Sequence, residues 1–439
     1  LYSGISHAAD KVLYIQEITS PGGVSAWLAE DHSVPVIALS FGFKGAGAVN
    51  DPADKQGLAR MLSNTMDEGA GDLDSQAFQK QLLDLSIDLH FGADRDHFTG
   101  GLKTLARNKD QAFKLLALAV TQPRFDEEPV NRMREANRSR VRSSLSDPDW
   151  ITARILNDVA FAGHPYAQNS GGTLSTLENI TPEDLRGFHD RYLGKKNLVV
   201  AVAGDITKDE LSRVLDEVFG GLPEIAPLPP PSFLELQGQG SVFLYKKNIP
   251  QTIIEMLQPG IDNHDPDYQI AQVMNFILGS SGFGSRLTKE IREKRGLTYG
   301  IYSSFMEMNL FDGLSVSTST ENKNAAEILS LTSVEWEKMK TAPVAQEELQ
   351  DAQTYLIDSL PLSLSSTDNI AGLMLSLRLD DLPVDYLERR EEAIRKTTGE
   401  DVQRVAQRIL DFNRMTTVLV GAPEGVNNVK IVETIPGVE

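Results

Sequence analysis

An arginine and a tyrosine in the second half of the chain have the side-chain types and spacing that suit catalysis. The stretch Gly279–Phe305 reads GSSGFGSRLTKEIREKRGLTYGIYSSF: a glycine-rich turn, a charged helix, a glycine stop and an alternating strand. This order lets Arg292 at the helix end and Tyr299 in the strand point into one space. A guanidinium and a phenol hydroxyl that converge on a peptide carbonyl can stabilise the oxyanion that forms there.

The same stretch also fits a purely structural interpretation. Glu290 and Lys294 have the i,i+4 spacing of an ion pair on a solvated helix. Tyr299 alternates with Leu297 and Ile301, as residues on the core face of a strand do. Pattern alone leaves both interpretations open.

Three glycines precede this helix, at Gly279, Gly282 and Gly284. Backbone N–H groups of such a turn at a helix start can hold a phosphate or another part of a substrate. A loop that needs positive backbone angles before a helix explains the same glycines.

Other catalytic signatures are absent. The chain has no cysteine, which excludes disulfides, thiolate zinc sites and thiol nucleophiles. No two of its 7 histidines stand three or four residues apart, so a helical HExxH or HxxEH zinc site is missing. Neither a Gly-x-Ser-x-Gly elbow nor a Gly-x4-Gly-Lys phosphate loop occurs.

Bulk properties restrict the partners. The formal net charge of −20 over 439 residues repels phosphate backbones and anionic lipid surfaces, so nucleic acid is not an expected partner. No apolar run reaches the roughly 18–20 residues that a membrane-spanning helix needs. The chain begins with Leu1 rather than Met, so we expect that processing or cloning removed something from its front.

Periodicity predicts an alternation of strands and helices. Residues 24–30 and 34–43 predict two strands joined as a hairpin, and 53–66 a helix with one apolar face. Helix starts are predicted at Thr181, a cap followed by proline and acidic residues, and at Thr207, which begins a capping box.

The chain is an internal duplication. Thr181-Pro-Glu-Asp-Leu and the strand ending at Gly204 have counterparts in Thr398-Gly-Glu-Asp-Val and the strand ending at Gly421, both 217 residues further on. Near the midpoint, residues 222–240 are rich in proline and form a linker.

These observations predict an α+β fold made of two homologous mixed α/β domains, 1–221 and 241–439, separated by the linker 222–240. Each domain is expected to contain a mostly antiparallel sheet covered by helices. Two such domains tend to enclose a cleft, and functional sites prefer these interfaces.

The phrase around the arginine and tyrosine resembles the pitrilysin (insulinase-like) family of zinc peptidases. In that family the second domain carries an Arg followed seven residues later by a Tyr, within a phrase much like SRL...REKRGLTY, and the match falls on Arg292 and Tyr299. The resemblance covers nearly the whole chain. It implies two duplicated domains in a clam-like arrangement, and a role for the pair in substrate binding and transition-state stabilisation.

The same resemblance places the family's inverted zinc motif HxxEH in GLARMLSNTMDEGAG, where its functional positions are Arg60, Ser63 and Asn64. A guanidinium cannot replace a neutral imidazole on zinc, a serine cannot replace the glutamate base, and an asparagine is a poor zinc ligand. The downstream glutamate ligand falls near Val141 on an ungapped count, with Glu135 the nearest acid. No metal or other cofactor is therefore expected on this chain.

A chain with the arginine and tyrosine but no zinc motif resembles the zinc-lacking subunit of two-subunit family members such as the processing peptidases. This implies a homologous partner that carries HxxEH and zinc, peptide substrates, and no activity of this chain alone. Gly279, Gly282 and Gly284 lie where that subunit has a longer glycine-rich loop implicated in substrate capture. The alternatives are a non-proteolytic structural or peptide-binding subunit, like the respiratory-complex core proteins, and an autonomous peptidase with zinc held elsewhere.

The compartment follows only from indirect features. The non-Met start and the absence of cysteine fit a periplasmic location slightly better than the cytoplasm or the mitochondrion.

Overall fold

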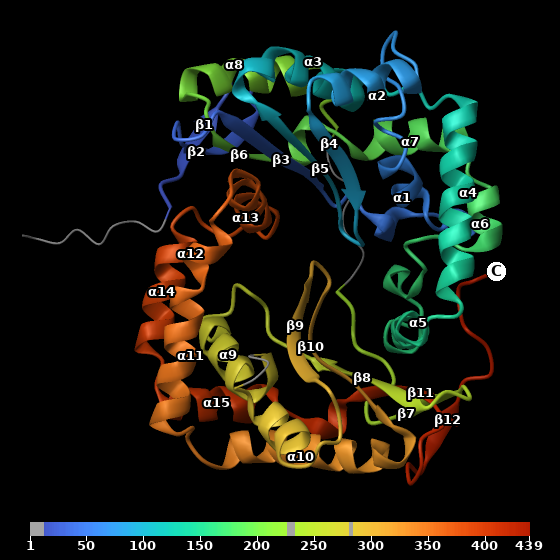
Figure 1. Ribbon diagram of the computed structural model, residues 1–439, viewed down its shortest axis with the longest axis vertical. Helices are drawn as coiled ribbons and strands as arrows, with labels where there is room; N and C mark the ends of the chain where they lie inside the picture. The colour runs from blue at the N-terminus through green and yellow to red at the C-terminus, as the bar shows by residue number, and fades with distance from the viewer. Residues whose placement is uncertain (1–12, 226–232, 281–283) are drawn as a thin grey trace, which may run out of the picture.

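Two six-stranded mixed sheets form the framework of the protein (Figure 1). The computed structural model describes residues 13–225, 233–280 and 284–439. Within these residues, no helix is long and apolar enough to span a bilayer.

The first sheet has the order β1-β2-β6-β3-β5-β4, with only the β2–β6 pair parallel. Its strands are β1 (Gln16–Thr19), β2 (Ser25–Glu30), β3 (Val36–Lys44), β4 (Asp88–Ala93), β5 (His97–Leu105) and β6 (Leu198–Gly204).

The second sheet repeats this order from the second position onward, as β12-β7-β11-β8-β10-β9. Its strands are β7 (Val242–Lys246), β8 (Gln251–Pro259), β9 (Ile301–Met308), β10 (Phe311–Glu321), β11 (Thr416–Gly421) and β12 (Val429–Ile431). The repeats differ at one edge, where β1 is antiparallel to β2 but β12 is parallel to β7. The predicted duplication and mostly antiparallel sheets are confirmed.

Helices cover both sheets. Those of the first half are α1 (Leu58–Ser63), α2 (Ser75–Asp84), α3 (Lys109–Thr121), α4 (Glu127–Ser144), α5 (Pro148–Ala160), α6 (Leu174–Glu178), α7 (Pro182–Tyr192) and α8 (Lys208–Phe219). Those of the second half are α9 (Tyr268–Asn275), α10 (Ala325–Thr341), α11 (Gln346–Asp358), α12 (Leu360–Ser363), α13 (Thr367–Leu379), α14 (Tyr386–Lys396) and α15 (Gly399–Ile409). Two π-helical segments span Phe276–Ser280 and Thr288–Glu293.

The predicted helix starts are confirmed. The Thr181 hydroxyl accepts the N–H of Asp184 at the start of α7, and Thr207 does the same for Glu210 at the start of α8. Thr398, the duplicate of Thr181, caps α15 in the same way. The repeated cap is a local sign of the duplication.

The predicted hairpin of the first two long strands is wrong. β6 lies between β2 and β3, parallel to the one and antiparallel to the other. Local alternation identifies strands, but a strand about 160 residues downstream fills the space between these two.

Two equivalent helices are exchanged between the halves. α5 of the first half packs on β8 and β11, whereas α13 of the second half packs on β3 and β6. In Figure 1, α13 (orange) lies under the blue first sheet, and α5 (teal) lies beside the second. Each sheet therefore completes its core with a helix from the other half.

Small residues allow α13 to approach the first sheet closely. Ala38, Ala201 and Ala203 of the sheet lie in one buried cluster with Ala371 and Met374 of the helix. At the end of α13, the half-buried Arg378 guanidinium donates hydrogen bonds to the carbonyl oxygens of Ser25 (3.0 Å) and Val200 (2.5 Å). The helix is thus held by both packing and polar contacts.

We expect residues 1–221 to be unstable when expressed alone, because without α13 they expose the sheet face around Trp27, Ala38 and Ala201. Burial of one large apolar side chain contributes about 1.5–3 kcal/mol, and domains of this kind have only about 5–15 kcal/mol to lose. Co-expression with residues 222–439 should restore a soluble complex that unfolds cooperatively. A monomeric 1–221 fragment with a cooperative thermal transition would contradict this expectation.

Candidate functional site

The first element of the candidate site is α1, a short helix held by its own start. Gly57 precedes it with a φ of +90°, and the buried Asp51 carboxylate accepts the N–H groups of Gly57 (2.8 Å) and Ala59 (3.0 Å). Burial raises the pKa of Asp51 to about 7, against these hydrogen bonds. Met61 and Leu62 are buried in the core. A different face of the helix therefore carries its polar side chains.

The three predicted motif positions lie on or next to this helix. The buried Ser63 hydroxyl donates to the carbonyl oxygen of Arg60 at 2.8 Å, so it is turned back onto the backbone. The Asn64 side-chain oxygen accepts a hydrogen bond at 3.0 Å from Nδ2 of Asn137. Arg60 is half-buried, and its Nε atom is buried without a hydrogen-bond partner.

The α4 residue that faces the motif is Asn137, which the sequence-based count missed. Val141 is buried in the core, and Glu135 is exposed and pairs with Arg138. Asn137 is 1% exposed and makes the contact with α1. The assignment of the downstream position to Val141 or Glu135 stays a prediction, and Asn137 is a further candidate for it. A count along the sequence does not fix the axial register of two helices separated by two strands and further helices.

This cluster does not fit a zinc ion. Four of its side chains are the guanidiniums of Arg60 and Arg140 and the amides of Asn64 and Asn137. Arg140 belongs to the cluster because its Nη2 donates to Asn137 Oδ1 at 2.6 Å. Zinc in proteins prefers imidazole, thiolate and carboxylate donors. Among the described residues, no group of three or more histidine, aspartate or glutamate side chains is placed to hold a metal.

Tyr299 and Arg292 lie on either side of a tight turn in the second half. Arg292 is half-buried in the π-helical segment Thr288–Glu293, and its carbonyl oxygen accepts the N–H of Gly296 at 2.8 Å. Tyr299 precedes β9, which begins at Ile301, and is 84% exposed. The interpretation that placed Tyr299 in a strand, on its core face, is wrong, since Tyr299 lies in a loop and faces solvent.

The backbone around Tyr299 is anchored although its side chain is free in solvent. The hydroxyl of the buried Thr298 donates to the carbonyl oxygen of Ser319 on β10 at 2.7 Å and accepts the N–H of Gly300 at 3.1 Å. The phenol therefore projects from a fixed loop. Convergence of Arg292 and Tyr299 on one substrate stays a prediction.

The helix before Tyr299 carries the predicted ion pair. Glu290 pairs with Lys294 and also with Arg295, whose Nη1 lies 2.9 Å from its carboxylate. Hydrogen bonds from Lys294 and then Arg295 lower the pKa of Glu290 to about 2.

The glycine positions differ from one another. Gly279 is buried in the π-helical segment Phe276–Ser280, and a Cβ atom there would lie 2.4 Å from the Ser303 hydroxyl oxygen. Close packing on β9 thus requires a glycine. Gly284 is exposed, and Gly282 lies outside the described residues. Contact of Gly279, Gly282 and Gly284 with substrate remains a prediction.

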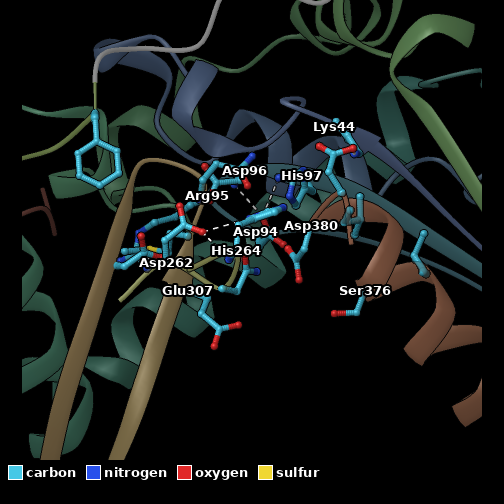
Figure 2. A pocket seen from close by; sticks show the side chains of 18 of the residues that line it. Lys44, Asp94, Arg95, Asp96, His97, Asp262, His264, Glu307, Ser376 and Asp380 are labelled. Atoms are coloured by element: carbon cyan, nitrogen blue, oxygen red, sulfur yellow. Dashed lines mark hydrogen bonds and ion pairs between the residues drawn. The ribbon is translucent and has the colours of Figure 1, made fainter. Parts of the chain in front are cut away.

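A cavity of about 690 Å³ lies between the two halves (Figure 2). Side chains from the β4–β5 turn, the loop after β8, the β9–β10 hairpin and the end of α13 line it. The charged ones are Lys44, Asp94, Arg95, Asp96, Asp262, Glu307, Asp312, Asp380 and Asp381. A cleft between the two domains was predicted, but none of these lining residues was. The local sequence signal for them is the charged turn Asp94-Arg-Asp-His between two strands.

Carboxylates from different segments repel one another in this cavity. Burial, followed by the charges of Asp262 and Glu307, raises the pKa of Asp312 to about 6, while His264 opposes the rise. Burial and then Glu307 raise the pKa of Asp380 to about 6 as well. Repulsion between ionised groups is thus part of the interface at neutral pH.

One hydrogen bond joins two of the segments that line the cavity. The Asp96 carboxylate on the β4–β5 turn accepts the backbone N–H of Asn309 on the β9–β10 hairpin at 3.2 Å. It also accepts the Tyr166 hydroxyl. The tips of the two equivalent hairpins therefore meet.

Comparison with known proteins agrees with this geometry. Residues 179–356 match the family model described as the peptidase M16 inactive domain. The chain is thus similar to M16 peptidases over this segment. The resemblance to pitrilysin-like zinc peptidases is thereby confirmed.

Several M16 relatives match along almost their whole length. The chain is 25% identical to the non-peptidase homolog YmxG of Helicobacter pylori, over 89% of this chain and 90% of that protein. It is 20% identical to the mitochondrial-processing peptidase subunit beta of Saccharomyces cerevisiae, over 89% and 88%.

Solved structures show the same fold. An M16 inactive domain from Pseudomonas fluorescens, 27% identical, superimposes with a TM-score of 0.88 over 96% of this chain and 100% of that one. A chain of complex III from Candida albicans, 16% identical, gives a TM-score of 0.77 over 94% and 97%.

The position of Asn137 can be tested by rebuilding the M16 zinc motif. We expect R60H/S63E/N64H to bind zinc weakly and the same variant with Asn137→Glu to bind it at least about tenfold more tightly, because a third ligand is added. Competition with a chromophoric chelator measures both affinities. Val141→Glu in place of Asn137→Glu is the matched control and should give no gain; tighter binding with Val141→Glu would contradict the assignment.

The raised pKa of Asp312 predicts a pH-dependent stability. The folded protein keeps a proton on Asp312 up to about pH 6, whereas the unfolded chain releases it near pH 4. The contribution of Asp312 to stability therefore falls as the pH rises through this range. Allowing for screening by solvent, we expect Asp312→Asn to raise the free energy of unfolding by about 1 kcal/mol at pH 7.5 and very little at pH 4.

Urea denaturation at the two pH values measures this difference. Asp351→Asn, on the exposed surface of α11, makes the same charge change and should alter stability by less than about 0.5 kcal/mol at either pH. If Asp312→Asn raised the free energy of unfolding equally at both pH values, the burial and repulsion of an ionised Asp312 would not be the cause of the gain.

Proposed function

We propose that this chain is the zinc-lacking subunit of a two-subunit M16 peptidase that cuts peptides or unfolded segments. The observation that carries the proposal is the contrast between the two halves. The positions expected to hold zinc and the catalytic base carry Arg60, Asn64 and Ser63. Arg292 and Tyr299, in contrast, are present at their expected spacing, and Tyr299 is 84% exposed.

In this proposal the partner supplies the metal chemistry. A homologous subunit with HxxEH would bind zinc, its zinc-bound water would attack the peptide carbonyl, and its glutamate would move the proton. Arg292 and Tyr299 would hold the substrate and the developing oxyanion from across the chamber. An exposed phenol on an anchored loop suits a contact that only the assembled complex makes.

Similarity to a protein named as a subunit of a processing peptidase supports the two-subunit arrangement. A second candidate function, a non-proteolytic structural or peptide-binding subunit, has its own support in the similarity to a protein named a non-peptidase homolog. The Arg292/Tyr299 pair favours the peptidase subunit, because a scaffold requires neither side chain. A periplasmic location remains a prediction that cell fractionation can check.

The test uses the complex with an HxxEH partner, sought as a neighbouring coding region for a chain of similar length. We expect Tyr299→Phe to lower kcat by about 10²–10³, the usual loss for one oxyanion contact, with zinc content and assembly unchanged. Peptide turnover, metal analysis and size-exclusion chromatography measure the three properties.

Tyr302→Phe is the matched control. Tyr302 is also an exposed tyrosine, at 51% exposure, but it lies on β9 whereas Tyr299 precedes that strand. Its activity should stay near that of the wild type. Wild-type turnover by Tyr299→Phe would remove the proposed role, and a complex that binds but never cleaves peptides would favour the structural subunit.

A further inference from the structure

Two arginines at the former metal position lack a carboxylate partner. Arg60 lies one helical turn before Asn64 on α1, and Arg140 lies one turn after Asn137 on α4. Neither guanidinium forms an ion pair within the described parts of the chain, whereas Arg132 and Arg138 on the same α4 each do.

The two guanidiniums are close enough to affect each other. Burial, and then the positive charge of Arg60, lowers the pKa of Arg140. Two like charges on neighbouring helices raise the free energy of the empty site. A bound anion would remove this repulsion.

Near Arg60 and Arg140, the side-chain oxygen acceptors already accept hydrogen bonds, whereas several N–H donors have no partner among the described residues. Oδ1 of Asn64 accepts from Asn137, and Oδ1 of Asn137 accepts from Arg140. The Ser63 hydroxyl is turned onto the carbonyl oxygen of Arg60. What remains is the Asn64 amide N–H₂, the buried Nε of Arg60 and the other N–H groups of Arg140.

We propose that Arg60, Asn64 and Arg140 form an anion site that binds a carboxylate of a peptide. The donors come from facing helices, and guanidinium forks match a planar carboxylate in geometry and charge. The peptide is the favoured carrier because residues 179–356 match a model of a peptidase family. The carboxylate comes either from the end of a peptide or from an acidic side chain.

The proposed site has the opposite charge preference to a zinc site. The HxxEH motif supplies lone pairs that bind a cation, whereas Arg60, Asn64 and Arg140 supply N–H groups that bind an anion. The inference goes beyond the proposed function, because binding of a carboxylate to this chain requires neither zinc nor the partner subunit.

The test measures binding of fluorescently labelled peptides to the full chain by anisotropy. Four peptides of one sequence carry a free C-terminal acid or a C-terminal amide, each with either Glu or Gln at one internal position. We expect at least one of the two carboxylates to tighten binding about tenfold or more, as a charge-assisted contact does. The four peptides thus separate a terminal from a side-chain source.

Arg140→Gln should abolish this preference, and Arg142→Gln should keep it. Both residues lie on α4 and are exposed, so both variants should fold and each loses one positive charge. Thermal unfolding checks their folding.

Three results would overturn the proposal. The first is equal binding of all four peptides by the wild type. The second is a preference that Arg140→Gln retains in full. The third is binding of inorganic phosphate at the pair, shown by competition that Arg140→Gln removes, with no preference among the peptides.

Discussion

Each sheet of this protein is completed by a helix that the other half supplies. The contact is both apolar and polar: α13 places Ala371 and Met374 on the alanine-rich face of the first sheet, and Arg378 donates to the carbonyl oxygens of Ser25 and Val200. Burial lowers the pKa of Arg378 to about 10, which is the cost of holding a guanidinium there. The exchange makes the two halves one structural unit, although their sequences are separate copies.

The exchange also determines what lies between the halves. Because α13 crosses to the first sheet, its end brings Asp380 and Asp381 against Lys44 of β3, with a 2.5 Å ion pair between Lys44 and Asp381. The β9–β10 hairpin adds Glu307 (Figure 2) and Asp312 to the lining of this cavity. Lys44 and Arg95 cannot neutralise all of its carboxylates, so protonatable groups remain at an interface that the packing of the helices holds together.

The sequence predicts the parts of this fold that depend on local or repeated patterns. Helix caps at Thr181 and Thr207, the duplication and the family resemblance are all readable, because each rests on residues close in sequence or on a repeat. The insertion of β6 between β2 and β3 and the exchange of helices were not predictable in this way. An amphipathic pattern states that α13 buries one face, and it contains nothing about which sheet receives it.

The candidate site divides along the same line. Resemblance located Arg60, Ser63 and Asn64 within one short motif, and the structure places them on one helix and its cap. The α4 residue that contacts the motif lies more than 70 residues downstream, a distance over which a count has no fixed register, and in the structure Asn137 makes this contact. Tyr299 was located by its phrase, but its exposure depends on where β9 begins and on the anchoring of Thr298, which are tertiary properties.

Replacement of a metal ligand by Arg60 changes the kind of charge at the site and not only its occupancy. A zinc ion is a Lewis acid with an open position, and it lowers the pKa of a bound water enough to make a nucleophile. A guanidinium stays protonated, has no open coordination position and donates hydrogen bonds only. Arg60 and Arg140 could therefore attract a negative group but could not generate a hydroxide, so in the proposed complex the nucleophile would come from the partner. The exposed phenol of Tyr299 would then donate a hydrogen bond to the oxyanion that forms in that complex.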